Sequence, residues 1–215
     1  MAKRRLDRSQ RRVLVLQAAL AVISEKGLDE ARMADIGDAA GMSAGHVMYY
    51  FPSKADLLMQ ALKWSEDQFL SGAQQAIKSL PTARERLWHL ISLSVPEAPT
   101  DPAWILWLET WARASHDRRV ARFQRGIEKR WIAALTSVIR EGQQTGEFAD
   151  LDADNFAVTL SALIDGLAIR MLGGAAAMTR KRLLEICAER IEADLITRPT
   201  APAVGPRLSR PSAGP

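Results

Sequence analysis

The chain has 215 residues, of which 47% are hydrophobic and 25% are charged, as expected for one or two globular domains. Its one cysteine, Cys187, excludes an internal disulfide and fits a reducing compartment such as the cytoplasm. We see no signal peptide and no apolar run near the ~20 residues of a membrane span, so the sequence predicts a cytoplasmic protein without membrane contact.

The net charge of +4 is concentrated at the N-terminus. Residues 1–12 hold six basic residues against one acidic residue, whereas residues 13–197 are slightly acidic. A basic arm over residues 1–8 fits contact with a polyanion such as double-stranded DNA. A solvated, frayed terminus explains the same charges, and the charge pattern alone leaves both explanations open.

The first helices that the pattern predicts are short. Ser9 is suited to cap a helix whose apolar residues repeat at three- and four-residue spacing, with Gly27 as its stop. A second helix ends at Gly41, where a tight turn needs the left-handed backbone that glycine adopts readily. Ser43 caps a third helix and Ser53 a fourth. Helices this short bury little apolar surface alone, so we expect the first three to pack on the fourth.

Longer amphipathic segments follow, separated by proline- and glycine-rich stretches, and no alternating pattern indicates a strand. The sequence therefore predicts an all-α fold, in which three short helices precede a larger helical domain. Residues 198–215 hold five of the ten prolines, and we expect this tail to be disordered. The long helices are expected at 54–78, 83–95, 103–115, 118–141, 153–173 and 179–197.

The short third helix lies in the segment ARMADIGDAAGMSAGHVMYYFPSKADLL (31–58). It carries a histidine and two tyrosines, whose side chains end in polar groups. In a helix-turn-helix, the second helix lies in the major groove, where its N-terminal residues contact base edges and phosphates. A helical hairpin whose tyrosines fill a core is the alternative for a helix of this length. The segment closely resembles the DNA-binding signature of TetR-family transcriptional regulators, through its Ala-Gly, Met-Ser-x-Gly, aromatic and Phe-x-x-Lys positions. The resemblance extends over residues 9–69.

The resemblance implies a helix-turn-helix DNA-binding domain over residues 9–54, with the motif at 32–51. Two positions depart from the family pattern: Met48 stands where many members have a phosphate-contacting tyrosine, and Arg32 stands where a capping threonine is common. The operator sequence therefore cannot be inferred. The residues expected to contact DNA are small, hydroxyl-bearing, aromatic or basic, and they are Arg8, Arg32, Ser43, Ala44, Gly45, His46, Tyr49, Tyr50 and Lys54.

A second stretch, residues 138–172, resembles the C-terminal halves of many members, especially BetI-like ones. The resemblance implies an effector-binding and dimerisation domain over residues 55–197, whose last two long helices pair with their copies in a homodimer. Periodicity alone allows the same apolar stripes to be intrachain core. A dimer is favoured because one short helix reads too few bases for a specific site. The interface candidates are Phe156, Leu160, Leu163, Gly166, Leu167, Leu184 and Ile191.

Three tryptophans of the segment 103–115 fall on one helical face, at positions i, i+3 and i+7. Such a stripe is the ordinary pattern of a helical core. It also suits an aromatic cage for a flat or cationic effector, with Glu109 as the counter-charge. The effector itself cannot be identified from the sequence. The pocket candidates are Trp88, His89, Trp104, Trp107, Glu109, Trp111 and Trp131.

These observations predict a ligand-responsive transcriptional regulator that binds a palindromic operator as a homodimer and is released by a small-molecule effector. Repression is the default of the family, and we expect the effector to act through the fourth helix. An enzyme is not expected, because His46, His89 and His116 are scattered and no metal or cofactor motif is present. The alternative is a helical protein-binding adaptor, whose affinity would depend only weakly on salt.

Overall fold

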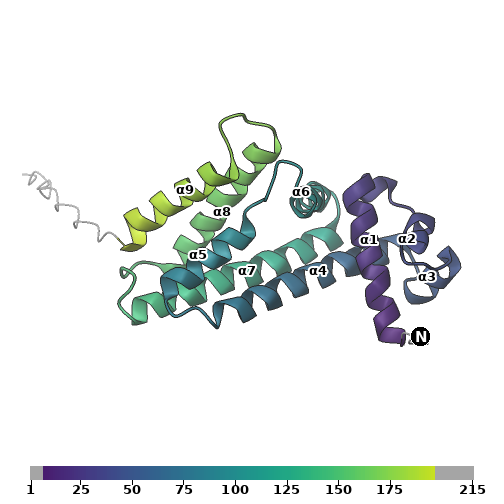
Figure 1. Cartoon of the computed structure of the whole chain (residues 1–215), viewed down its shortest axis with the longest axis horizontal. Coiled ribbons are helices and arrows are strands. Elements are labelled where there is room, and N and C mark those ends of the chain that lie inside the picture. Colours follow the sequence, from purple (N-terminus) through teal and green to yellow (C-terminus); the bar gives the residue numbers. More distant parts are fainter. Residues whose placement is uncertain (1–6, 197–215) are drawn as a thin grey trace, which may run out of the picture.

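The structure, a computed structural model, describes residues 7–196. Within that range it has nine α-helices and no strand, which confirms the all-α prediction (Figure 1). The proline-rich tail and the first six residues of the basic arm lie outside the described residues. The helices are α1 (Arg8–Glu30), α2 (Met33–Ala39), α3 (Ala44–Tyr50), α4 (Lys54–Ile77), α5 (Ala83–Ser94), α6 (Pro102–Ala114), α7 (Arg118–Gln144), α8 (Ala153–Leu172) and α9 (Arg180–Ile191), followed by the π-helical turn η1 (Glu192–Ile196).

The start and end of α1 differ from the prediction. Asp7, not Ser9, caps the helix: its carboxylate accepts a hydrogen bond from the Gln10 N–H at 2.8 Å, and the Gln10 side chain accepts one from the Asp7 N–H at 3.0 Å. This reciprocal capping box satisfies two backbone donors, which a lone serine hydroxyl cannot do. Gly27, with φ of 82°, breaks the helical geometry as predicted, but helical turns resume beyond it as far as Glu30.

The turn between α2 and α3 is tight. Gly41 has φ of 65°, as predicted for this turn, and the Met42 N–H donates to the Gly37 carbonyl at 2.8 Å. A Cβ atom on Gly37 would lie 2.8 Å from the Met42 carbonyl oxygen, so the backbones meet where only glycine fits. Ser43 caps α3 as predicted, accepting a hydrogen bond from the His46 N–H at 3.2 Å.

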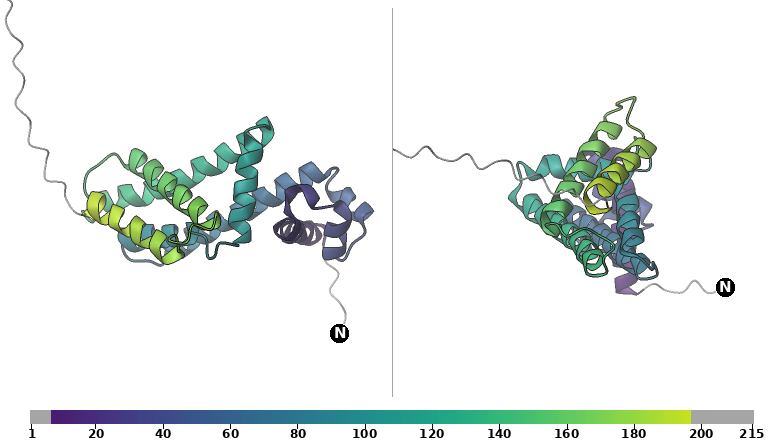
Figure 2. Two further views of the ribbon diagram at one scale, coloured as in Figure 1. Left: turned by 90° about the horizontal axis from the view of Figure 1, so that it is seen from above. Right: turned by 90° about the vertical axis from the view of Figure 1, so that its left-hand side faces the viewer.

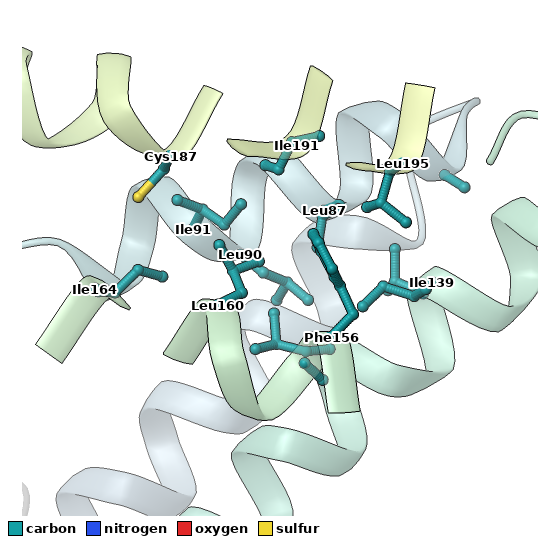
Figure 3. Packing of buried hydrophobic residues seen from close by; sticks show 14 of the residues in the cluster. Leu87, Leu90, Ile91, Ile139, Phe156, Leu160, Ile164, Cys187, Ile191 and Leu195 are labelled. Carbon is teal, nitrogen blue, oxygen red and sulfur yellow. The ribbon is translucent and has the colours of Figure 1, made fainter. Parts of the chain in front are cut away.

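The buried side chains form two clusters. The first joins α1, α2 and α3 to the N-terminal half of α4. The second lies among α4, α5, α7, α8 and α9, and Figure 3 shows the α5, α8 and α9 side chains that meet there, with Cys187 among them. Burial raises the pKa of the Cys187 thiol to about 11, as is typical of a cysteine that packs as a small apolar core residue.

Two helices extend between these clusters. α4 begins in the first cluster and continues beside α7 in the second (Figure 1). α6 crosses the molecule between α1 and α7, and it is seen end-on in Figure 1 and lengthwise in Figure 2. α4 and α6 are therefore two candidate connections between helices α1–α3 and the larger helical domain, and only α4 was predicted from the sequence.

One helix has a composition that the sequence analysis did not single out. By length and hydropathy alone, α8 could cross a membrane. The core helix of a soluble protein passes the same test, and seven side chains of α8 are buried in the chain's own core. Its exposed face nevertheless carries Val158 and Ile169, which are 52% and 49% exposed. The rest of the chain does not cover this apolar face of α8.

Candidate functional site

α3 presents a mixture of small and aromatic residues to solvent. Tyr49 is 66% exposed and Met48 53% exposed, while Gly45 is also exposed and Val47 is fully buried. A Cβ atom on Gly45 would meet no atom within 4 Å, so this surface is open in the free protein. Ala44 and His46 are partly exposed on the same short helix. Five of the six residues from Ala44 to Tyr49 are thus available for contact, without a cavity or catalytic group among them.

Tyr50 differs from the other predicted contacts. Its side chain is only 9% exposed, and its ring stacks on His46 with ring centres 5.5 Å apart. The Tyr50 carbonyl oxygen accepts a hydrogen bond from the Arg12 guanidinium at 3.4 Å. The ring belongs to the first buried cluster and helps to hold α3 on its support, while the DNA contact predicted for Tyr50 stays a prediction.

The three basic residues that were predicted to contact DNA have different surroundings in the structure. The Arg8 guanidinium lies 5.5 Å from the centre of the Tyr49 ring, a cation–π arrangement at the exposed end of the helix. The Lys54 ammonium donates to the Asp29 carbonyl oxygen at 2.7 Å and so ties α4 to the end of α1. Arg32 is exposed at the start of α2. Arg8 and Tyr49 therefore form a closer pair than the sequence spacing suggested.

The larger domain has a partly open cavity of about 260 Å³ between α4, α5, α6, α7 and α8. Four predicted residues line it, which places the tryptophan stripe of α6 at a cavity rather than in solid core: Trp104, Trp107, Trp111 and Trp131. The Trp104 indole N–H donates to the Ser94 carbonyl oxygen at 3.2 Å, which holds one ring of this wall in place. Trp111 is 47% exposed.

Three predicted pocket residues lie elsewhere. Trp88 and His89 are on α5 and do not line the cavity, and Trp88 is 38% exposed. Glu109 projects from the opposite side of α6, where its carboxylate lies beside Gly27 of α1. The proposed counter-charge is therefore corrected, because a residue two positions from Trp107 and Trp111 lies about 200° away around a helix.

The acidic residues of the cavity were missed by the sequence analysis. Glu66 and Asp165 are half-buried in its wall, and Glu128 lies at its exposed rim. Burial raises the pKa of Glu66 to about 7 and that of Asp165 to about 6, and the nearby charge of Glu128 adds to the second effect. The signal for Glu66 was its spacing: it stands four residues from both Leu62 and Leu70, on the buried face of α4.

The residues predicted for a dimer interface divide into two groups. Phe156, Leu160 and Ile191 are 1–6% exposed and belong to the chain's own core, so they support α8 and α9 from inside (Figure 3). Gly166 is exposed. The remaining three are partly buried against the core, and they are Leu163, Leu167 and Leu184. Val158 and Ile169, the two most exposed aliphatic residues of α8, were not among the predicted interface residues.

Comparison with known proteins connects these features. Residues 15–61 match the family model for bacterial regulatory proteins of the tetR family, and residues 83–195 match the model for the C-terminal part of BetI-type transcriptional repressors. The chain belongs to the TetR family. Its C-terminal match assigns it to the BetI-type group, as the resemblance of residues 138–172 predicted.

Two kinds of relative support this assignment. The transcriptional regulator BetI of Escherichia coli K12 is 30% identical over 165 residues, which cover 75% of this chain and 82% of BetI. A transcriptional regulator from Saccharomonospora viridis, solved in complex with choline, is 30% identical with a TM-score of 0.80, over 89% of this chain and all of the other. A TetR-family regulator from Rhodococcus is 25% identical with a TM-score of 0.73, over 86% of this chain and 98% of the other. The chain is therefore a TetR-family transcriptional regulator and not an enzyme.

Proposed function

We propose that this TetR-family chain is a homodimeric repressor, which binds a palindromic operator through α3 and leaves it when a small organic cation enters the tryptophan-lined cavity. One observation carries the proposal. α6 contributes Trp104, Trp107 and Trp111 to the cavity, and the same helix buries Leu106 in the cluster that supports α2 and α3. A ligand that moves α6 therefore acts on both clusters at once.

The exposed chemistry of α3 supports the DNA-binding part of the proposal. Gly45 and Ala44 allow close approach to a duplex, and the hydroxyl of exposed Tyr49 suits a phosphate or base edge. Arg8 lies over the Tyr49 ring, where its charge adds to the phosphate affinity of the same surface. The proposed DNA-binding domain spans residues 9–54, the arm 1–8, and the effector and dimerisation domain 55–197.

The apolar face of α8 supports the homodimer. Val158, Ala162, Gly166 and Ile169 are exposed at helical spacing, and the small residues permit a second helix to approach closely. Two copies related by a two-fold axis would place two α3 helices against half-sites about 34 Å apart or a multiple of it, in a palindromic site. A dimer that covers this face also accounts for the hydropathy of α8 in a cytoplasmic protein.

The lining of the cavity supports a cationic effector. Aromatic faces attract ammonium groups, and the carboxylates of Glu66 and Asp165 provide the opposite charge in a partly desolvated site. The Saccharomonospora viridis relative was solved with choline, a quaternary ammonium ion of this class. Binding can change DNA affinity only through the difference in ligand affinity between the two states, typically about 1–3 kcal/mol.

The test begins with selection of duplexes from a random pool by the full-length protein, which we expect to enrich an inverted repeat. Fluorescence anisotropy on the selected duplex should then give binding that weakens steeply with salt, by about −0.9 in log affinity per log salt for each phosphate contacted. Tyr49→Ala and Lys54→Ala should weaken it, and choline should release the DNA. Weak binding that ignores sequence, salt and both substitutions would instead favour the protein-binding adaptor.

A further inference from the structure

The charges that line the cavity are all of one sign. Five carboxylates face it, and within residues 7–196 no lysine, arginine or histidine lines it. Two of the five have partners in the protein. Glu97 forms a salt bridge with Arg180 at 3.0 Å, and Asp101 caps α6 by accepting a hydrogen bond from the Ala103 N–H at 2.9 Å. These two carboxylates are used by the fold itself.

The other three carboxylates are Glu66, Glu128 and Asp165. None of them forms a salt bridge or hydrogen bond with another part of the described chain. The charge of Arg130 lowers the pKa of Glu66, but the Arg130 guanidinium is paired with Asp67. A half-buried carboxylate without a partner is costly when ionised, so a cationic ligand that pairs with it in the cavity is favoured.

These three carboxylates form two separate centres. Asp165 of α8 is close enough to Glu128 of α7 for the charge of Glu128 to raise the pKa of Asp165. Glu66 lies on another helix of the cavity wall, α4. The cavity thus has one negative centre on the α4 wall and another on the α7–α8 wall.

A ligand with a single charge balances only one of these centres and leaves the other desolvated. We infer that the cavity selects ligands with two cationic ends, such as small α,ω-diamines, with one end facing Glu66 and the other facing Asp165 and Glu128. The methylene chain would lie against the tryptophan rings, which favour both apolar and cationic groups. The volume of about 260 Å³ restricts the ligand to a small one. The inference rests on the proposed function, in which the cavity binds a cation.

Isothermal titration calorimetry on the full chain at pH 8 tests this inference. The probes are α,ω-diamines of four to eight carbons, each compared with the primary monoamine of the same length, and choline serves as the reference monocation. We expect at least one diamine to bind about tenfold more tightly than its monoamine. Glu66→Gln and the double variant Asp165→Asn/Glu128→Gln should each reduce that ratio to near one, because each removes one of the two negative centres.

Asp154→Asn is the matched control: Asp154 is also on α8, but it pairs with Arg140 outside the cavity. This variant should keep the diamine preference, and thermal melting should show that all three variants are folded. Equal affinities for diamine and monoamine, or a diamine preference that persists in both cavity variants, would overturn the inference. The proposal that the cavity binds a cation would not be affected by that result. If choline and every amine fail to bind, the inference and the cationic effector of the proposed function fall together.

Discussion

Leu106 and Trp107 are neighbours in α6 but belong to different parts of the molecule. Leu106 is 8% exposed and packs in the cluster formed by α1 to α4, whereas Trp107 lines the cavity of the larger domain. On the same side as the α1 contact, Arg113 of α6 forms a salt bridge with Asp29 near the end of α1. A shift of α6 that repacks the tryptophans must also move these contacts.

Arg113→Ala should therefore weaken the effect of the ligand on DNA binding, with little change in either affinity alone. An exposed ion pair contributes about 0–1 kcal/mol, so we expect the effect of choline on DNA affinity to fall by up to about fivefold. Anisotropy titrations with and without choline measure this coupling. Arg140→Ala, which removes an exposed pair with Asp154 between α7 and α8, is the control. If choline changes DNA affinity equally in both variants, the contact of Arg113 with α1 does not contribute to the coupling between the two sites.

Two glycines of the helix-turn-helix should respond differently to the same substitution. Gly45→Ala meets open space in the free protein and should leave stability unchanged or raise it by up to about 1 kcal/mol, since alanine favours helix. We expect DNA affinity to fall, because the added methyl group occupies the surface where the duplex approaches. Chemical denaturation and anisotropy measure the two effects separately. Undiminished DNA affinity would exclude Gly45 from the interface.

Gly37→Ala provides the contrast. Its new Cβ atom would lie 2.8 Å from the Met42 carbonyl oxygen, so the turn between α2 and α3 must open. We expect a loss of stability of about 1–3 kcal/mol, as for other overpacked sites, together with a loss of DNA binding. A Gly37→Ala variant as stable as the parent would mean that the turn can shift without cost.

The sequence was sufficient for the helices and for α3 because local signals agreed there. Ser43 caps α3, Gly41 makes the turn with positive φ, and Val47 is buried, all at the positions that the pattern predicted. The burial of the Tyr50 ring was not predicted, because an aromatic side chain with a polar tip suits a DNA contact and a core position equally well. The packing of Tyr50 against His46 and α1 is visible only in the folded chain.

The cavity was harder to predict, because its walls come from helices far apart in sequence. The stripe of Trp104, Trp107 and Trp111 was visible, but no local pattern shows whether a stripe faces a cavity or a core. Glu109 was chosen for its proximity in sequence, although helical geometry turns it away from the stripe. Glu66 was hidden among the apolar residues of α4, where an acidic side chain at a buried position was the available signal.

The buried amide of Gln124 gives a prediction about stability. Gln124 is 5% exposed, and neither its nitrogen nor its oxygen has a hydrogen-bond partner in the described chain. Gln124→Leu should raise the free energy of unfolding by about 1–2 kcal/mol, because a side chain of similar size replaces a desolvated amide. Urea denaturation measures the change.

Gln143→Leu is the control for this prediction on the same helix. The Gln143 amide donates to the carbonyl oxygens of Ala149 at 3.1 Å and Leu151 at 2.9 Å, so its removal should lower stability by about 1 kcal/mol. If Gln124→Leu is as destabilising as Gln143→Leu, the Gln124 amide has a partner, such as a bound water.

The half-buried carboxylate of Glu66 predicts how stability depends on pH. Burial raises its pKa from an ordinary 4.5 to about 7, with Arg130 opposing the shift and Asp67 adding to it. A group whose pKa is raised by folding stabilises the folded state fully below its unfolded pKa, and this contribution is lost as pH rises through the folded pKa. The ligand-free protein should therefore lose stability between about pH 4.5 and pH 7.

Glu66→Gln removes this titration and should be more stable than the parent at pH 8, by about 1–3 kcal/mol, while the two proteins should be nearly equal at pH 4.5. A cationic ligand favours the ionised carboxylate, so its affinity for the parent should rise with pH over the same window. Urea denaturation and calorimetry at several pH values measure the two effects. A stability difference that does not vary with pH would show that folding does not raise the pKa of Glu66.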